Sequence, residues 1–252
     1  MIGTKNIRLL LLSLSTALLL QSSVILNGIT PAFALKVKFE PPKSEPAPKI
    51  TIGGGRRDNG TCDGQSNTTN SRMTGANTAE KLTALLPSTH LGLTLTSHPT
   101  FLVYVPKTSA KVLEFTLEDE AGEGIYQTKI NLKGVPGIVS FSLPKTEPAL
   151  EVGKDYRWVV SIICQQTGPT NPFIEGLVRR SPVNATLTNR INKAKPLEQI
   201  VLYSQSGYWF EALTNLANLR LSQPQNREIK TAWNELLESV DLNAIANAPL
   251  QK

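Results

Sequence analysis

The chain has 252 residues, of which 26 are Lys or Arg and 20 are Asp or Glu, so its formal net charge is +6. Its two cysteines are too few for a knottin-like scaffold or a four-cysteine zinc site. The absence of an unbroken apolar run of about 20 residues excludes a polytopic membrane protein. An apolar content of 40% is sufficient for a sizeable core, and the length fits one large domain or two small ones.

Residues 1–34 have the pattern of a secretory signal peptide. Lys5 and Arg8 precede an apolar stretch, and Ala32 and Ala34 provide the small residues that signal peptidase accepts, so we expect cleavage after Ala34. The alternative is an uncleaved anchor that continues to Ile29. Cleavage removes two bases and no acid, which leaves a net charge of +4 and no electrostatic argument for nucleic-acid binding.

Residues 35–80 are rich in Pro, Gly, Ser and Asn, and we predict a flexible, mostly extended arm. Cys62 lies in this arm, and Cys164 follows the apolar run 159–163. Because exported cysteines usually pair, we expect a Cys62–Cys164 disulfide that holds the arm to the domain. Two independent thiols, with Cys164 as a small core residue, are the alternative.

Period-two alternation predicts a strand-rich domain over residues 81–181. Leu113, Phe115 and Leu117 alternate with polar residues, and an acidic turn at 118–124 separates them from the next strand. The seven predicted strands are 91–96, 100–105, 112–118, 125–132, 138–143, 155–164 and 172–179. Many short strands separated by turns are typical of an antiparallel β-sandwich, giving a mainly β fold with added α structure.

One turn gives this prediction more detail. Leu150, Gly153 and Tyr156 occur at the spacing of the corner before the sixth strand of fibronectin type III domains, and the segment resembles that corner. The resemblance implies an immunoglobulin/fibronectin-III-like sandwich in which Tyr156 locks the corner and Trp158 fills the core. A binding role for Trp158 is the alternative.

Residues 182–252 are expected to form a helical cap. Ile229, Trp233 and Leu236 fall on one face of a helix that Asn226 can cap. Gly207, the aromatic residues after it, Ala212 and Pro224 resemble the second half of a tetratricopeptide repeat, with residues 197–206 as the preceding helix. A single helical pair is too short for an array, so we expect it to pack on the sandwich. Trp209 and Trp233 are core residues by default and candidates for partner contact if either is exposed.

The sequence does not predict catalytic, metal or cofactor chemistry. His90 and His98, the only histidines, have no Cys or acid at ligand spacing, and G-x-S-x-G does not occur. The acidic turn differs from the calcium loop of EF-hands, which favours a solvated hairpin tip. We therefore assign no catalytic residue, no metal ligand and no cofactor.

Several phrases together resemble the cyanobacterial exported proteins grouped as the domain of unknown function 928 family. The resemblance covers about residues 80–250 and includes the helical tail at 207–212 and 233–240. It implies an exported bacterial protein and carries no activity. The phrases are residues 90–94, 99–106, 136–140, 153–156, 161–164 and 178–180.

These observations lead to an expected function. We expect a non-enzymatic binding or structural protein of the bacterial envelope, in the periplasm or secreted, whose partner is an envelope protein or a surface glycan. Nucleic acid is not an expected partner, and no stable membrane span remains after cleavage. The alternatives are a carboxylate-dependent enzyme acting on cell-wall polysaccharide and a signalling ectodomain partner.

Overall fold

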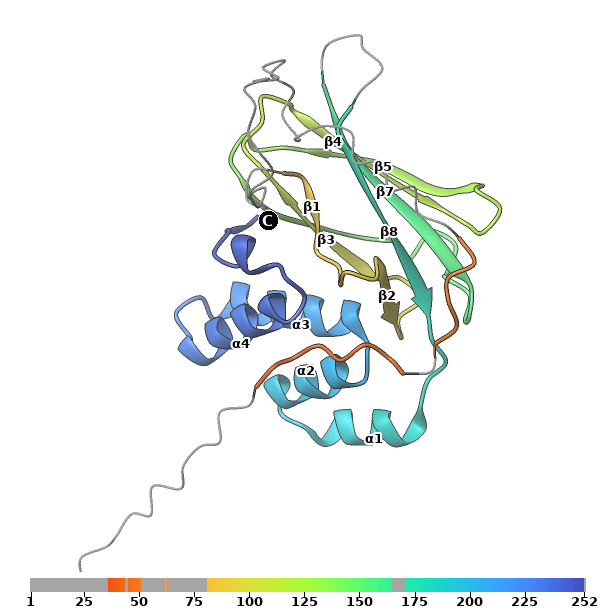
Figure 1. The fold of residues 1–252 in the computed structure, drawn as a ribbon, viewed down its shortest axis with the longest axis vertical. Coiled ribbons are helices and arrows are strands. Elements are labelled where there is room, and N and C mark those ends of the chain that lie inside the picture. Colours follow the sequence, from red (N-terminus) through yellow and green to blue (C-terminus); the bar gives the residue numbers. More distant parts are fainter. Residues whose placement is uncertain (1–35, 44, 51–61, 63–80, 165–170, 252) are drawn as a thin grey trace, which may run out of the picture. The chain divides into compact units, whose positions relative to one another are not determined.

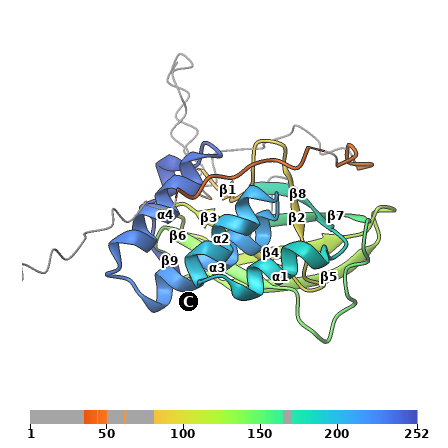
Figure 2. The ribbon, with the colours of Figure 1, turned by 90° about the horizontal axis from the view of Figure 1, so that it is seen from below.

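The described part of the chain contains two β-sheets and four α-helices. The structure is a computed structural model that describes residues 36–43, 45–50, 62, 81–164 and 171–251. Figure 1 shows the strands above the helices, and Figure 2 shows the helices in front of the strands. The predicted signal peptide, with Ala32 and Ala34, lies outside the described residues. Among the helices that are described, none has the length and apolar character that crossing a membrane requires.

The first sheet has four strands, in the order β1 (Thr83–Ala84), β3 (Thr100–Val105), β6 (Gly137–Ser142) and β9 (Leu250–Gln251). Strand β3 pairs antiparallel with β1 and β6, whereas β9 joins the edge parallel to β6. The last strand therefore returns the C-terminal segment to the sheet after all the helices.

The second sheet has five strands, in the order β2 (Leu91–Thr94), β8 (Phe173–Arg180), β7 (Asp155–Ile163), β4 (Val112–Glu118) and β5 (Gly124–Asn131). Strand β2 pairs parallel with β8, and the other pairs are antiparallel. Each of the seven predicted strands is present. The expectation of purely antiparallel sheets is wrong, because β2 and β9 each join a sheet edge in the parallel direction.

Aromatic rings join the two sheets and the helices in one core. Phe101 on β3 lies 5.0 Å from Phe115 and 5.6 Å from Trp158, measured between ring centroids, and both of these residues belong to the other sheet. Phe101 also meets Phe210 edge to face at 5.3 Å. Strand β3 is buried over five consecutive residues because it packs on the second sheet and also on a helix.

The helices are α1 (Ala185–Lys193), α2 (Pro196–Gln205), α3 (Trp209–Ser222) and α4 (Arg227–Glu238). As predicted, the Asn226 side chain caps α4, accepting hydrogen bonds from the backbone N–H groups of Glu228 and Ile229. The apolar face of α4 is buried, including Trp233. Helix α1 is an additional element that the sequence pattern did not single out.

Two described parts of the predicted arm are packed against the domain. Val37 is fully buried and Phe39 is 5% exposed, whereas their neighbours Lys36, Lys38 and Glu40 are exposed. We call residues 36–43 the proximal strap and residues 45–50 the distal strap. The proximal strap packs through two alternating apolar side chains, Val37 and Phe39, which are buried on the helices. The composition of residues 35–80 did not indicate this packing.

Candidate functional site

The predicted corner residues have structural contacts. The Tyr156 hydroxyl accepts a hydrogen bond of 2.9 Å from the backbone N–H of Glu151, across the turn in which Gly153 has φ +82°. Leu150 and Trp158 are each 1% exposed. Because the Trp158 ring is buried among Phe101 and its neighbours, it has no surface with which to contact a partner.

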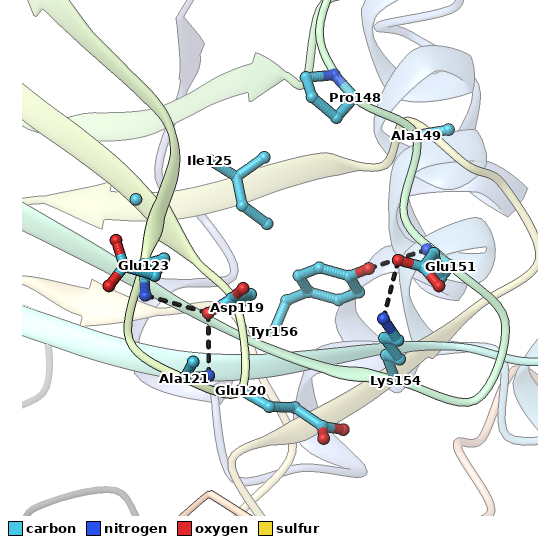
Figure 3. A pocket seen from close by; sticks show the side chains of 11 residues that line it. Asp119, Glu120, Ala121, Glu123, Ile125, Pro148, Ala149, Glu151, Lys154 and Tyr156 are labelled. Carbon is cyan, nitrogen blue, oxygen red and sulfur yellow. Dashed lines mark hydrogen bonds and ion pairs between the residues drawn. The ribbon is translucent and has the colours of Figure 1, made fainter.

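A pocket of about 560 Å³ lies between the tip of the β4–β5 hairpin and this corner (Figure 3). Its wall carries carboxylates from Asp119, Glu120, Glu123 and Glu151, together with Lys154. Asp119 accepts hydrogen bonds from the backbone N–H groups of Ala121 and Glu123, so it closes the hairpin turn.

Two other carboxylates of the pocket are also held in place. Glu151 pairs with Lys154 at 2.8 Å, which raises the pKa of Lys154. Glu120 accepts a hydrogen bond of 3.0 Å from the backbone N–H of Asp155 and pairs with Lys49 at 3.3 Å. The hydrogen bond from Asp155 lowers the pKa of Glu120. A carboxyl that serves as a general acid needs the opposite shift.

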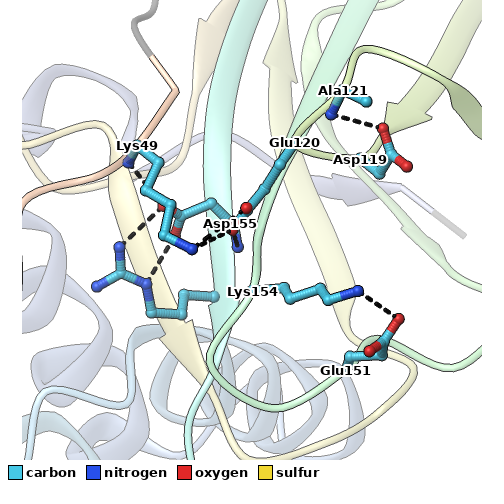
Figure 4. A network of polar contacts seen from close by, with 8 residues as sticks. Lys49, Asp119, Glu120, Ala121, Glu151, Lys154 and Asp155 are labelled. Atoms are coloured by element: carbon cyan, nitrogen blue, oxygen red, sulfur yellow. Dashed lines mark hydrogen bonds and ion pairs between the residues drawn. The ribbon is translucent and has the colours of Figure 1, made fainter.

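A buried ion pair lies next to this pocket, where β7 begins and β8 ends (Figure 4). Arg179 donates from Nε to Asp155 Oδ1 at 2.6 Å and from Nη2 to Asp155 Oδ2 at 2.9 Å. The two side chains are 5% and 1% exposed. The hydrogen bond with Asp155 raises the pKa of Arg179, so the guanidinium remains charged despite its burial.

The distal strap covers this pair. The Lys49 backbone N–H donates to Asp155 Oδ2 at 2.9 Å. Arg179 Nη1 donates to the carbonyl of Pro46 at 2.8 Å and to Glu45 Oε2 at 3.2 Å. The strap thereby supplies polar partners that a buried ion pair requires in addition to its own charges.

The proximal strap lies on the helices. The backbone N–H of Val37 donates to Glu235 Oε2 at 2.9 Å, and that of Phe39 donates to Ser239 Oγ at 3.0 Å. The Phe39 ring meets Trp209 edge to face with centroids 5.1 Å apart. This segment therefore reads as an extended peptide bound by α3, α4 and the residue that follows α4.

The predicted disulfide is confirmed. Cys62 and Cys164 are joined with a Cα–Cα distance of 5.4 Å, and the bridge spans 102 positions. Cys164 directly follows β7, so the bridge fixes Cys62, a residue of the predicted arm, to the end of a strand of the second sheet.

The two tryptophans of the helical region do not form an exposed contact surface. Trp209 and Trp233 are both fully buried. The Trp209 indole N–H donates to the carbonyl of Leu85 at 2.8 Å, and that of Trp233 donates to the carbonyl of Ala246 at 2.9 Å. Both side chains are core residues, as the sequence favoured, with the ring buried and the N–H donor satisfied internally, so the exposure on which a partner contact depended is not present.

Glu211 is a buried carboxyl that the sequence did not reveal. Its Oε1 accepts hydrogen bonds from Thr94 Oγ1 at 2.7 Å, from the Leu95 N–H at 2.7 Å and from the Thr96 N–H at 3.1 Å. Its Oε2 is buried without a partner among the described residues. Burial raises the pKa of Glu211 against these hydrogen bonds. An acid in the first turn of α3 looks like an ordinary helix-end charge, so nothing in the sequence indicated its burial.

The histidines are held by local contacts. His98 makes hydrogen bonds through Nδ1 with Ser97 Oγ at 2.9 Å and through Nε2 with the carbonyl of Glu147 at 3.1 Å. His90 has a φ of +57° in the turn before β2. Within the described ranges, no three His, Cys, Asp or Glu side chains gather in a way that would hold a metal ion.

Comparison with known proteins identifies a family. The family model described as Domain of Unknown Function (DUF928) matches residues 52–250, which include all four helices and every residue of the two sheets except Gln251. No curated protein matches the chain.

Proposed function

The chain belongs to the DUF928 family, and from its own chemistry we propose that it is an exported binding or structural protein of the bacterial envelope. The Cys62–Cys164 disulfide is the observation that carries the proposal. Disulfides persist in oxidising compartments and are rare in the reducing cytosol. The signal peptide predicted over residues 1–34 provides the route of export, and the periplasm or the medium is the destination.

Strand order supports a more specific architecture. In immunoglobulin-type sandwiches, strands A, B and E are neighbours in one sheet, and strands C, F and G in the other. Strands β1, β3 and β6 follow the first order, and β4, β7 and β8 follow the second. The bond from Glu151 to Tyr156 supports the fibronectin-III-like corner. We therefore propose an immunoglobulin/fibronectin-III-like sandwich.

The helical region is proposed to be a cap with one tetratricopeptide-like pair, α2 and α3. Gly207 takes a φ of +82° in the turn between these helices, and the small side chain of Ala212 is fully buried. Both features fit the roles that the repeat gives to these residue types. Helix α3 packs on the strands β2 and β3, as expected for a cap rather than a free solenoid.

A carboxylate-dependent enzyme acting on cell-wall polysaccharide is the alternative, because carboxylates line the pocket in Figure 3. Three of them are used otherwise: Asp119 closes a turn, Glu151 pairs with Lys154, and Glu120 bonds to Asp155 and Lys49. The lowered pKa of Glu120 makes it a poor proton donor. These contacts favour binding over catalysis.

The partner is proposed to be an envelope protein or a surface glycan. Affinity capture from an envelope extract, with residues 35–252 immobilised in the oxidised form, tests this. We expect a retained partner. Capture of no partner, together with turnover of a cell-wall polymer, would overturn the proposal in favour of the enzyme.

A further inference from the structure

The helices hold the proximal strap in the way that peptide-binding proteins hold an extended ligand. Val37 and Phe39 are buried, and the residues on either side of them are exposed. This alternation is the mark of an extended segment that presents every second side chain to a surface. Figure 1 shows the segment, in orange, running across the helical region.

Backbone hydrogen bonds contribute to the recognition of the proximal strap. Three N–H groups of the strap donate to acceptors outside it: Glu235 Oε2 at 2.9 Å, Ser239 Oγ at 3.0 Å and the Ser204 carbonyl at 3.0 Å. The first two acceptors are side-chain oxygens, and the third is a backbone carbonyl of α2. The strap is therefore not paired as a strand of either sheet. Main-chain hydrogen bonds of this kind give affinity that does not depend on ligand sequence.

Two contacts add a sequence preference. The ring of Phe39 lies edge to face on Trp209, with centroids 5.1 Å apart. Pro42 lies so close to Gly207 that a Cβ at position 207 would be 2.8 Å from the proline Cδ. The surface therefore accommodates an aliphatic residue, a phenylalanine two positions later and a proline three positions after that.

The proximal strap begins two residues after Ala34, the residue that precedes the predicted cleavage point. If cleavage occurs after Ala34, residue 35 becomes the chain terminus, and the proximal strap can leave without opening a closed loop. Among the described residues, the next contacts along the chain are those of Glu45 and Pro46 with Arg179. Release of the proximal strap then leaves the distal strap, the ion pair and the disulfide in place.

We propose that this surface, formed by Ser204, Gly207, Trp209, Glu235 and Ser239, is a peptide-binding site. Residues 36–42 are its resident ligand. They exchange with an extended segment of a partner protein that carries the same pattern of aliphatic residue, phenylalanine and proline. The inference rests on the proposed binding function and names the class of partner.

A titration tests the site directly. A fluorescent peptide with the sequence of residues 35–43 is added to purified residues 35–252, which form one compact unit, either unchanged or with Phe39→Ala. We expect saturable binding to the Phe39→Ala chain and at least about tenfold weaker binding to the unchanged chain, because the tethered strap competes at a high effective concentration. Lys38→Ala, at an exposed strap position, is the matched control and should behave like the unchanged chain.

Three outcomes would overturn the proposal. One is a Phe39→Ala chain that unfolds cooperatively yet binds no peptide. Another is equal binding to the unchanged and altered chains, which would place the peptide elsewhere. The third is undiminished binding of a peptide in which alanine replaces the phenylalanine.

If Phe39→Ala does not fold, Val37→Ala releases the strap with a smaller loss of volume. Because the titration uses purified protein, it is independent of whether export occurs.

Discussion

Removal of the disulfide should destabilise the protein strongly, through its unfolded state. The bridge closes a loop of 102 positions. In the chain-entropy model, a loop of that length restricts the unfolded chain by about 4.7 kcal/mol at 25 °C. For a domain of this size, each kcal/mol corresponds to roughly 2–4 °C in Tm, so we expect Cys62→Ser with Cys164→Ser to lower Tm by roughly 10–20 °C.

Urea unfolding of the oxidised chain and the double serine variant measures the effect. The urea concentration at the unfolding midpoint should fall. The free energy of unfolding should depend more steeply on urea concentration, because the unbridged unfolded chain exposes more surface. Cys164→Ser alone should lower the free energy of unfolding by the same amount. That result would show that the bridge, rather than the packing of the Cys62 side chain, is responsible. A loss below about 1 kcal/mol, with the slope unchanged, would refute the entropic reasoning.

Three further changes test other parts of the fold. Arg179→Met leaves the buried carboxylate of Asp155 without its cation and should cost about 3–5 kcal/mol in urea unfolding; a second change, Asp155→Asn, should recover part of that loss, and no recovery would contradict the pairing argument. Glu211 has a raised pKa, so the unchanged chain should lose stability relative to Glu211→Gln as pH rises from about 4.3 towards neutrality; parallel pH profiles would contradict the raised pKa. Gly176→Ala places a methyl group against Leu86 and should cost about 1–3 kcal/mol, whereas an unchanged thermal midpoint would mean that the core yields there.

The sequence predicted the strands whose own alternation of apolar and polar residues is long enough to be recognised. Strand β4 alternates perfectly between buried and half-buried residues, so its period was visible without any knowledge of its neighbours. Strands β1 and β9 have two residues each, which is too short for a period. Strand β2 ends at Thr94, earlier than predicted. The backbone N–H groups of Leu95 and Thr96 donate to the Glu211 carboxylate instead of to a neighbouring strand.

The packing of the proximal strap was not predicted, because the residues that it contacts are far away in the sequence. Composition over residues 35–80 indicates disorder, but Val37 and Phe39 bond to residues 198 and 200 positions later. The alternation of Lys36, Val37, Lys38 and Phe39 was the one local signal that could have revealed it. The disulfide was predictable because a chain predicted to be exported, with only two cysteines, has one possible intrachain pairing.

The most direct test of the account is the intact mass of the natural protein, measured after alkylation under non-reducing conditions. We predict a chain that begins at residue 35 and carries no alkyl group, because the signal peptide is removed and both cysteines are joined. A chain that begins at Met1 with both Cys62 and Cys164 alkylated would contradict export and the disulfide together.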